Sequence, residues 1–305
     1  MDQSHSWDGP IALVPPARDP AQPWDPDWRA LLADLPQAIA SKEIAPFYQP
    51  IIDLRGPALA GFECLARWHH PKRGLIGPDK FVPLAVGAGW IDAMSAMLLR
   101  QACRDMRKWH PRHTLSFNLA PPQLLGPFPD ECLAILDDTG TDPERLILEV
   151  TEELAITELG KARTAVERLR RHGITFALDD FGKGMANLHR LRELRFDRIK
   201  IDREVIALGG GDGVCDITRT VIALAQALDQ TITAEGVETA AQCAELTALG
   251  CTHAQGFYFS AAVPAGVAAT LARRPDPLIE RVRRATIEFQ RRPRPLPQPP
   301  VVSAL

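Results

Sequence analysis

Five short segments of this chain each end a run of strand-favouring residues on a side chain that carries a carboxylate or carboxamide oxygen. The segments span residues 115–118, 146–149, 175–180, 198–202 and 231–235. Because the carboxyl ends of neighbouring parallel strands meet at one mouth of a barrel, we expect these side chains to converge in space. Clustered oxygen donors are the ligands that hard divalent cations prefer. The pattern therefore predicts a metal-dependent active site.

Alternating strand and helix patterns predict an α/β fold of the TIM-type (β/α)8 barrel class. The steps from Asn118 to Glu149 and from Glu149 to Asp179 are 31 and 30 residues, close to the average unit of such a barrel. Only residues 55–57 separate the first two strands, which is too short for a helical crossover, so we expect an antiparallel strand near the start. The eight expected strands are residues 47–54, 59–66, 115–119, 146–151, 175–180, 198–202, 231–236 and 254–259.

The two ends of the chain differ in composition from its central part. Five prolines lie among the first 25 residues, so we expect a flexible N-terminal extension over residues 1–26 and a barrel over residues 27–275. We expect residues 276–305 to form a C-terminal helix and a proline-rich tail, with an apolar stripe of Leu278, Val282, Ala285 and Phe289. Packing of this stripe on the chain's own barrel is the favoured interpretation. Binding of a protein partner through the helix or tail is the alternative.

Cysteine usage, hydropathy and charge limit the environment and the partners of the chain. Its six cysteines are scattered without a Cys-x-x-Cys pair, which favours reduced thiols and argues against a zinc site. No apolar run approaches the ~20 residues of a membrane span, and the N-terminus lacks the features of a secretory signal, so we expect a cytoplasmic protein. A net charge of −3 argues against nucleic-acid polymers but allows a small phosphate ligand held through metals.

Two carboxylate positions carry the strongest chemical signal. Adjacent carboxylates at Asp179 and Asp180 repel each other unless cations neutralise them, although a strand-end turn with a helix cap would explain the same pair. Glu63 lies in an apolar strand, where an unpaired glutamate is costly to bury. We interpret Glu63 as a metal ligand, with a salt bridge to Arg67 as the alternative.

Four further polar residues stand at or near strand ends. Lys200 lies between two isoleucines, and it could orient a nucleophilic water and stabilise developing charge, or form a structural ion pair. Glu235 is a candidate metal ligand or general base, whereas Glu238 could merely favour the first turn of a helix. Gln255 is a weaker candidate for a hydrogen bond to a ligand.

Taken together, these residues resemble the EAL-domain family of bacterial cyclic di-GMP phosphodiesterases, over residues 30–270 or so. The family fold is a barrel like that expected above, with an antiparallel strand near its start. The motifs that carry the resemblance are Tyr48-Gln49-Pro50-Ile51, Glu63-Cys64-Leu65-Ala66-Arg67-Trp68, Asn118, Leu148-Glu149-Val150-Thr151-Glu152, Asp179-Asp180-Phe181-Gly182, Lys200-Ile201-Asp202, Ala234-Glu235-Gly236-Val237-Glu238-Thr239 and Gln255-Gly256-Phe257.

The resemblance implies hydrolysis of cyclic di-GMP (c-di-GMP) to linear pGpG with two Mg²⁺ or Mn²⁺ ions in each active site. It assigns the catalytic roles to Glu63, Lys200 and Glu235, with Lys200 positioning the water and Glu235 a candidate base. The implied ligands of the first metal are Glu63, Asn118, Glu149 and Asp179, and those of the second are Asp179, Asp180 and Glu235. The implied substrate-binding residues are Gln49, Arg67, Asp202 and Gln255, and Glu152 and Glu238 would support the loop after residue 180.

The chain departs from the family pattern at two motifs. The signature triplet is Glu-Cys-Leu instead of Glu-Ala-Leu, which is a small apolar change. The family usually has Gly-Thr-Gly-Tyr-Ser-Ser where this chain has Gly182-Lys183-Gly184-Met185-Ala186-Asn187. In the family that loop links metal binding to the contacts of a homodimer. Because every expected metal ligand is present, an active phosphodiesterase is the leading hypothesis. The altered loop makes a c-di-GMP receptor or adaptor of low activity the alternative.

Overall fold

The computed structural model describes residues 26–151, 159–182, 196–208 and 214–291. The expected N-terminal extension and the proline-rich tail lie outside these residues. Among the described helices, none is both long enough and apolar enough to cross a membrane.

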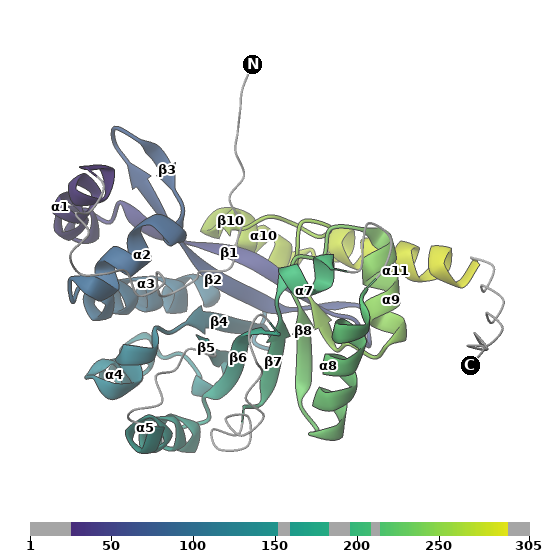
Figure 1. Ribbon diagram of the computed structural model, residues 1–305. Coiled ribbons are helices and arrows are strands. Elements are labelled where there is room, and N and C mark those ends of the chain that lie inside the picture. The colour runs from purple at the N-terminus through teal and green to yellow at the C-terminus, as the bar shows by residue number, and fades with distance from the viewer. Residues whose placement is uncertain (1–25, 152–158, 183–195, 209–213, 292–305) are drawn as a thin grey trace, which may run out of the picture.

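Eight strands close into a barrel, as the sequence predicts (Figure 1). Around the ring the order is β1, β9, β8, β7, β6, β5, β4 and β2, and pairing of β1 with β2 closes it. From β2 through β4 to β9, every neighbouring pair is parallel. The strands are β1 (Ile44–Asp53), β2 (Ala58–His70), β4 (Thr114–Asn118), β5 (Leu146–Thr151), β6 (Thr175–Phe181), β7 (Arg198–Ile201), β8 (Thr231–Ala234) and β9 (His253–Ala254).

Strand β1 is the exception, because it runs antiparallel to both of its neighbours, β2 and β9. A short turn at residues 54–57 joins β1 directly to β2, so the chain reverses instead of crossing over the barrel. The predicted hairpin is thereby confirmed. Its register places Gln49 opposite Glu63.

Helices cover the outside of the barrel (Figure 1). Most of them follow a strand and return the chain to the start of the next parallel strand, as a right-handed barrel requires. The described helices are α1 (Pro26–Ala40), α2 (Pro78–Gly87), α3 (Ile91–Met106), α4 (Phe128–Thr139), α5 (Leu159–Arg171), α7 (Arg203–Ala207), α8 (Asp216–Ala227), α9 (Ala240–Ala248), α10 (Ala265–Arg273) and α11 (Asp276–Arg291).

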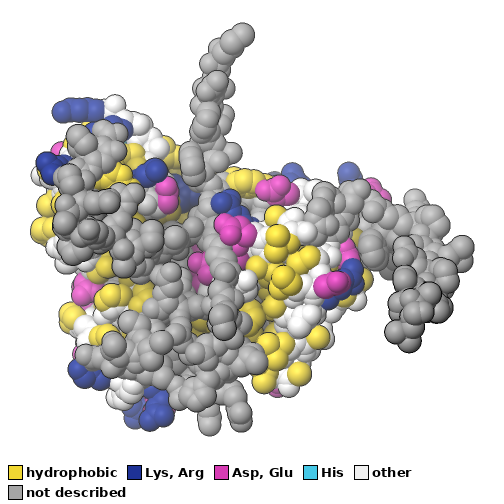
Figure 2. All heavy atoms as spheres, in the orientation of Figure 1, with side chains coloured by type: hydrophobic (Ala, Val, Ile, Leu, Met, Phe, Trp, Pro, Cys, Tyr) yellow, Lys and Arg dark blue, Asp and Glu magenta, His cyan; other side chains and the backbone are white. Residues whose placement is uncertain are grey.

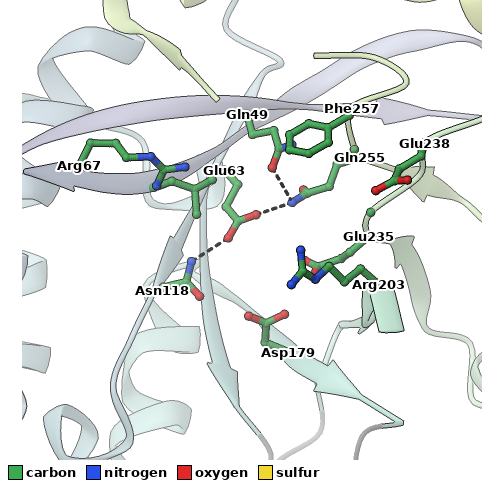
Figure 3. A pocket seen from close by; sticks show the side chains of 13 residues that line it. Gln49, Glu63, Arg67, Asn118, Asp179, Arg203, Glu235, Glu238, Gln255 and Phe257 are labelled. Carbon is green, nitrogen blue, oxygen red and sulfur yellow. Dashed lines mark hydrogen bonds between the residues drawn. The ribbon is translucent and has the colours of Figure 1, made fainter. Parts of the chain in front are cut away.

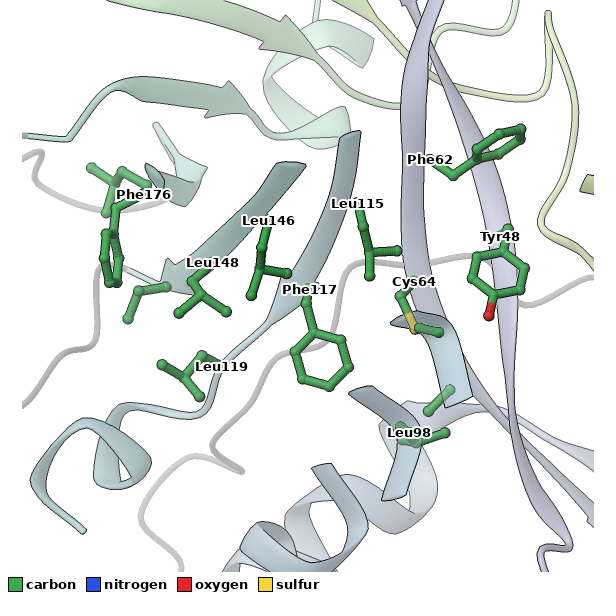
Figure 4. Packing of buried hydrophobic residues seen from close by; sticks show 14 of the residues in the cluster. Tyr48, Phe62, Cys64, Leu98, Leu115, Phe117, Leu119, Leu146, Leu148 and Phe176 are labelled. Carbon is green, nitrogen blue, oxygen red and sulfur yellow. The ribbon is translucent and has the colours of Figure 1, made fainter. Parts of the chain in front are cut away.

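Alternation along the strands separates an apolar layer from a polar interior. Outward-facing side chains such as Leu115, Phe117 and Phe176 are buried between the strands and the helices, in the same hydrophobic cluster as Leu98 of α3 (Figure 4). Ser116, between Leu115 and Phe117, is also fully buried and faces the barrel interior. The outer layer therefore supplies the hydrophobic core, which leaves the barrel interior free to hold polar residues.

The last strand of the barrel is much shorter than the sequence suggests. We expected a strand over residues 254–259, but β9 ends at Ala254. Gly256 has a φ of +150°, and a Cβ there would lie 2.2 Å from the backbone nitrogen of Val237. The chain thus leaves the sheet at a glycine packed against another loop. Two short strands were not predicted, β3 (Gly74–Ile76) on β2 and β10 (Val263–Pro264) on β1.

The C-terminal helix packs on the barrel's own helices. Leu278, Val282 and Ala285 of α11 are buried, and α11 lies alongside α9 (Figure 1). These three residues of the apolar stripe therefore contact this chain and are not available to a partner. The side chain of Phe289 lies outside the described residues.

The parallel pairing of β2 with β4 depends on a glycine. A Cβ at Gly61 would lie 2.2 Å from the backbone oxygen of Thr114 and 2.7 Å from its nitrogen, and neither atom can move without disturbing the ladder. We expect Gly61→Ala to lower the free energy of unfolding in urea by about 1–3 kcal/mol. Gly56→Ala is the control, because a Cβ at Gly56 meets nothing within 4 Å. Equal stability of the two variants would contradict this account of the β2–β4 pairing.

Candidate active site

The register of the strands brings inward-facing polar residues to one end of the barrel. Asn118 at the end of β4 pairs with Glu149 on β5. Glu63 on β2 pairs with Ser116, two residues before Asn118, so both point to the same face. Ala177 pairs with Glu149, which puts Asp179 of β6 one step further along that face. The predicted convergence of side chains is therefore present in the structure.

Lys200 lies at the centre of this end of the barrel, and four carboxylates surround its ammonium group. Its Nζ is 2.6 Å from Glu149 Oε2 and 2.6 Å from Glu235 Oε1. It is also 3.1 Å from Asp179 Oδ1 and 3.5 Å from Glu63 Oε1. The lysine side chain is only 1% exposed, so water does not screen these interactions.

Glu63 joins this cluster to the strands on the other side. Asn118 Nδ2 donates to Glu63 Oε1 at 2.7 Å, and Gln255 Nε2 donates to Glu63 Oε2 at 2.5 Å (Figure 3). Gln255 also donates to Gln49 Oε1 at 3.3 Å. Burial acts to raise the pKa of Glu63, but Lys200 and these hydrogen bonds outweigh burial and lower it. Glu63 is not paired with Arg67 through any bond that we observe among the described residues.

Burial opposes the negative charge of the remaining carboxylates. It raises the pKa of Glu149 to about 8, against the effect of Lys200, and the charges of Glu63 and Asp179 add to the rise. The pKa values of Asp179 and Glu235 are also raised, chiefly by burial. Burial alone would lower the pKa of Lys200, but the four carboxylates raise it well above its usual value. The lysine is therefore charged, and it neutralises only part of the cluster.

The donor chemistry of the cluster fits a hard divalent cation. Four carboxylates face one ammonium, so further positive charge or protons must balance the excess. Glu149 Oε1 is buried without a hydrogen-bond partner, which is unusual for a carboxylate oxygen. Within the described residues, no three Asp, Glu, His or Cys side chains are arranged to hold a metal ion as they stand. The carboxylates of the cluster are arranged around Lys200 instead.

The second aspartate of the pair has an uncommon backbone conformation. Asp180 has a φ of +59°, in the left-handed region, where a residue other than glycine is strained. Its N–H donates to Asp179 Oδ1 at 3.0 Å. This turn lets β6 end with Asp179 inside the cluster and Asp180 half-buried beside it. The loop that follows, residues 183–195, lies outside the described residues.

A pocket opens above the carboxylate cluster (Figure 3). Acidic side chains lie near the centre of the face shown in Figure 2, whereas hydrophobic ones gather over α7 and α8. The pocket itself has acidic side chains on its floor and two arginines, Arg67 and Arg203, in its wall. Its lining is Gln49, Glu63, Leu65, Arg67, Asn118, Asp179, Arg203, Glu235, Gly236, Glu238, Gln255, Gly256 and Phe257.

Three further predicted residues differ in where they lie: one away from the pocket, one at its wall and one outside the described residues. Asp202 is fully buried, and its Oδ1 accepts from the N–H of Glu204 at 2.7 Å as the N-cap of α7, so it does not line the pocket. Glu238 is exposed at the pocket wall, where its N–H donates to Gln242 at 2.9 Å. Glu152 lies outside the described residues.

Sequence reasoning missed two large side chains of the pocket, Arg203 and Phe257. Arg203 directly follows the predicted Lys200–Asp202 segment, and that position beyond a strand end is the signal that could have found it. A Cβ at Gly236 would lie 2.3 Å from Arg203 Cβ, so the glycine allows the arginine to sit beside Glu235. Phe257 lines the pocket and is 38% exposed.

Residues 32–262 match the family model of the EAL domain. The chain belongs to the EAL domain family. This EAL chain is 36% identical over 237 residues to the cyclic di-GMP phosphodiesterase NbdA of Pseudomonas aeruginosa, a match that covers 76% of this chain and 30% of NbdA. It is 35% identical over 235 residues to the cyclic di-GMP phosphodiesterase PdeL of Escherichia coli, covering 74% of this chain and 64% of PdeL.

Solved structures agree with the family assignment. The PaMucR phosphodiesterase in its c-di-GMP complex is 36% identical and superposes with a TM-score of 0.73, covering 78% of this chain and 99% of that one. The barrel fold and the EAL family, both inferred from sequence motifs, are therefore confirmed. The EAL chain spans less than two thirds of the length of the two curated relatives named above.

Replacement of Lys200 tests how far its ammonium group stabilises the buried carboxylates of this EAL domain. We expect Lys200→Met to lower the free energy of unfolding by about 3–5 kcal/mol in buffer with a chelator, since it leaves buried charges unpaired. Lys80→Met is the control, because Lys80 is exposed and its ion pair with Asp79, at 3.6 Å, is of the surface kind that contributes about 0–1 kcal/mol. Denaturant unfolding would measure both. A Lys200→Met variant as stable as Lys80→Met would show that the ammonium does not hold the cluster together.

Proposed function

We propose that this EAL domain hydrolyses one phosphodiester bond of c-di-GMP to give linear pGpG. The observation that carries the proposal is the cluster of Glu63, Glu149, Asp179 and Glu235 around Lys200, at the floor of an open pocket. Four carboxylic groups face one lysine, which is the surplus of oxygen ligands expected where divalent cations bind a phosphate ester. The similarity to NbdA and PdeL, which are cyclic di-GMP phosphodiesterases, supports the choice of substrate.

Two Mg²⁺ or Mn²⁺ ions would fit this donor set, since hard oxygen ligands suit both metals. The proposed ligands are Glu63, Asn118, Glu149, Asp179, Asp180 and Glu235. When bound, such ions lower the pKa of water and stabilise the charge that develops on the attacking and leaving oxygens. An acidic floor without added positive charge would instead repel a dianionic substrate.

The protein's own residues would handle the proton and the substrate. In the proposed reaction a water oxygen bonds to phosphorus and the bond from phosphorus to the 3′ oxygen breaks. The departing 3′ oxygen takes up a proton from solvent and becomes a hydroxyl. Glu235 lines the pocket beside Lys200 and is the candidate to accept the proton of the water. Lys200 contacts Glu235 at 2.6 Å and would hold the carboxylate and the water in position.

Residues in the pocket wall would orient the dinucleotide. Gln49 and Gln255 present amide groups, and Arg67 and Arg203 present guanidinium groups suited to phosphate oxygens. The structure adds Arg203 to the set expected from sequence. Asp202, buried as a helix cap, would act on the substrate only by fixing the start of α7, just before Arg203.

A c-di-GMP receptor of low activity is the second candidate. The sequence of residues 183–187 favours it, since that loop departs from the family pattern after the metal-binding pair. Formation of a homodimer through this region also stays a prediction, and so does the supporting role of Glu152 and Glu238.

Turnover of c-di-GMP to pGpG by the purified chain, followed by chromatography with Mg²⁺ or Mn²⁺, tests the main proposal. We expect activity that a chelator abolishes. Glu63→Gln should reduce kcat at least about 100-fold. Loss of a residue that merely supports a metal ligand already costs up to about 100-fold, and loss of a ligand should cost more. Glu167→Gln is the control, since that glutamate is exposed on α5, away from the pocket, and forms a surface ion pair with Arg163 at 3.7 Å. Turnover that persists in Glu63→Gln would refute the assigned role.

The same assay separates the enzyme from the receptor. If the wild-type chain binds c-di-GMP with little turnover, the variant Lys183→Thr/Met185→Tyr/Ala186→Ser/Asn187→Ser restores the usual family loop. We then expect kcat to rise by at least tenfold, about 1.4 kcal/mol of transition-state stabilisation. An unchanged rate would show that this loop does not limit catalysis, and absence of binding in both proteins would leave neither candidate standing.

A further inference from the structure

The loop between β9 and β10 touches the active site twice. Gln255, at its start, donates to Glu63 Oε2 at 2.5 Å. Ser260, near its end, offers its backbone oxygen to Gln49 Nε2 at 3.2 Å. Phe257 between them lines the pocket. The shape of this loop therefore sets the positions of three residues that face the proposed substrate.

The first half of the loop is fixed to the segment that carries Glu235. The N–H of Val237 donates to Gln255 O at 3.0 Å, and the N–H of Tyr258 donates to Val237 O at 2.9 Å. Gly256 allows the two segments to approach this closely, because any Cβ there would meet the Val237 backbone.

The C-terminal helix holds the second half. Arg281 of α11 donates through its Nη1 to the backbone oxygen of Tyr258. The same Nη1 donates to the backbone oxygen of Phe259 at 2.9 Å. The Tyr258 hydroxyl donates in return to Arg281 O at 2.8 Å. One guanidinium nitrogen carries two N–H groups and so serves two successive carbonyls, while the rest of the planar group stays fixed in orientation. The contact thus joins α11 and the loop in both directions.

Helix α11 is itself anchored to the barrel. Its buried residues Leu278, Val282 and Ala285 pack in the hydrophobic core beside α9, so the helix is a fixed support for Arg281. The helix spans Asp276–Arg291, beyond residues 32–262 that match the EAL model. Arg281 therefore lies outside the part of the chain that matches the family model.

We propose that Arg281 is a positioning residue for substrate binding: it clamps the 255–260 loop to α11 and so holds Gln255 and Phe257 against the pocket. The helix would act on the site through the loop and not through the reacting atoms. Anything that displaces α11 would then weaken substrate binding. The effect on KM rests on the proposed function, whereas the clamp itself does not.

Amide hydrogen exchange and steady-state kinetics on the full chain test the clamp together. In Arg281→Ala we expect faster exchange at the amides of Tyr258, Phe259 and Ser260, and a KM for c-di-GMP raised about tenfold, as for loss of charged hydrogen bonds, with a smaller fall in kcat. Arg281→Lys should show an intermediate KM. Arg283→Ala is the control, because that arginine is exposed on the same helix.

Each outcome decides the proposal. If exchange in the loop and KM both match the Arg283→Ala control, Arg281 does not position the loop. If Tm falls and exchange rises across α9 and α11 while KM stays unchanged, Arg281 is a stability residue only, and the proposal is wrong. If the wild-type chain shows no turnover, the exchange data still decide the clamp and only the proposed function fails. Tyr258→Phe, which removes the return bond but keeps the ring, replaces Arg281→Ala if the latter does not fold.

Discussion

The ion cluster around Lys200 is the interaction on which this EAL domain depends. One ammonium stands within 3.5 Å of four carboxylates from four different strands or strand ends. Such a group is tolerable inside a protein only when its members bond to one another, because an isolated buried charge would neutralise or unfold the site. The lysine holds the carboxylates together and leaves more acidic groups than cations at the pocket floor. The same arrangement therefore serves folding and prepares the site for cations.

The barrel makes this cluster possible by separating two environments. Each strand alternates between an outer apolar layer and a narrow interior, so the core forms without the inward-facing residues. Backbone pairing fixes where each inward residue lies, as the pairing of Asn118 with Glu149 illustrates. Loops after β8 and β9 then supply the pocket wall. Glycines at 236 and 256 allow these loops to approach each other and Arg203.

The sequence predicts the fold and the convergence of the site well, because both follow from local patterns. The spacing of Asn118, Glu149 and Asp179 is set by the length of one strand-helix unit, and the short link after β1 demands a hairpin. What it could not predict depends on contacts between distant segments. The end of β9 is decided by the packing of Gly256 on Val237, and Asp202 resembles a site residue but caps a helix. Arg203 enters the pocket only because Gly236 makes room for it.

The reversed strand at the start of the barrel has a consequence for how the chain folds. A turn of a few residues joins β1 to β2, so their long antiparallel ladder closes a very small loop, whereas each parallel neighbour must close a loop containing a helix. Loop-closure entropy and contact order both favour the local pairing. We expect the hairpin to assemble early and to act as the template on which the parallel strands are added. The pairing of β1 with β9 would then form last and close the barrel. Folding kinetics of hairpin variants would reveal this order, in which Gln49 and Glu63 meet before any of their partners arrive.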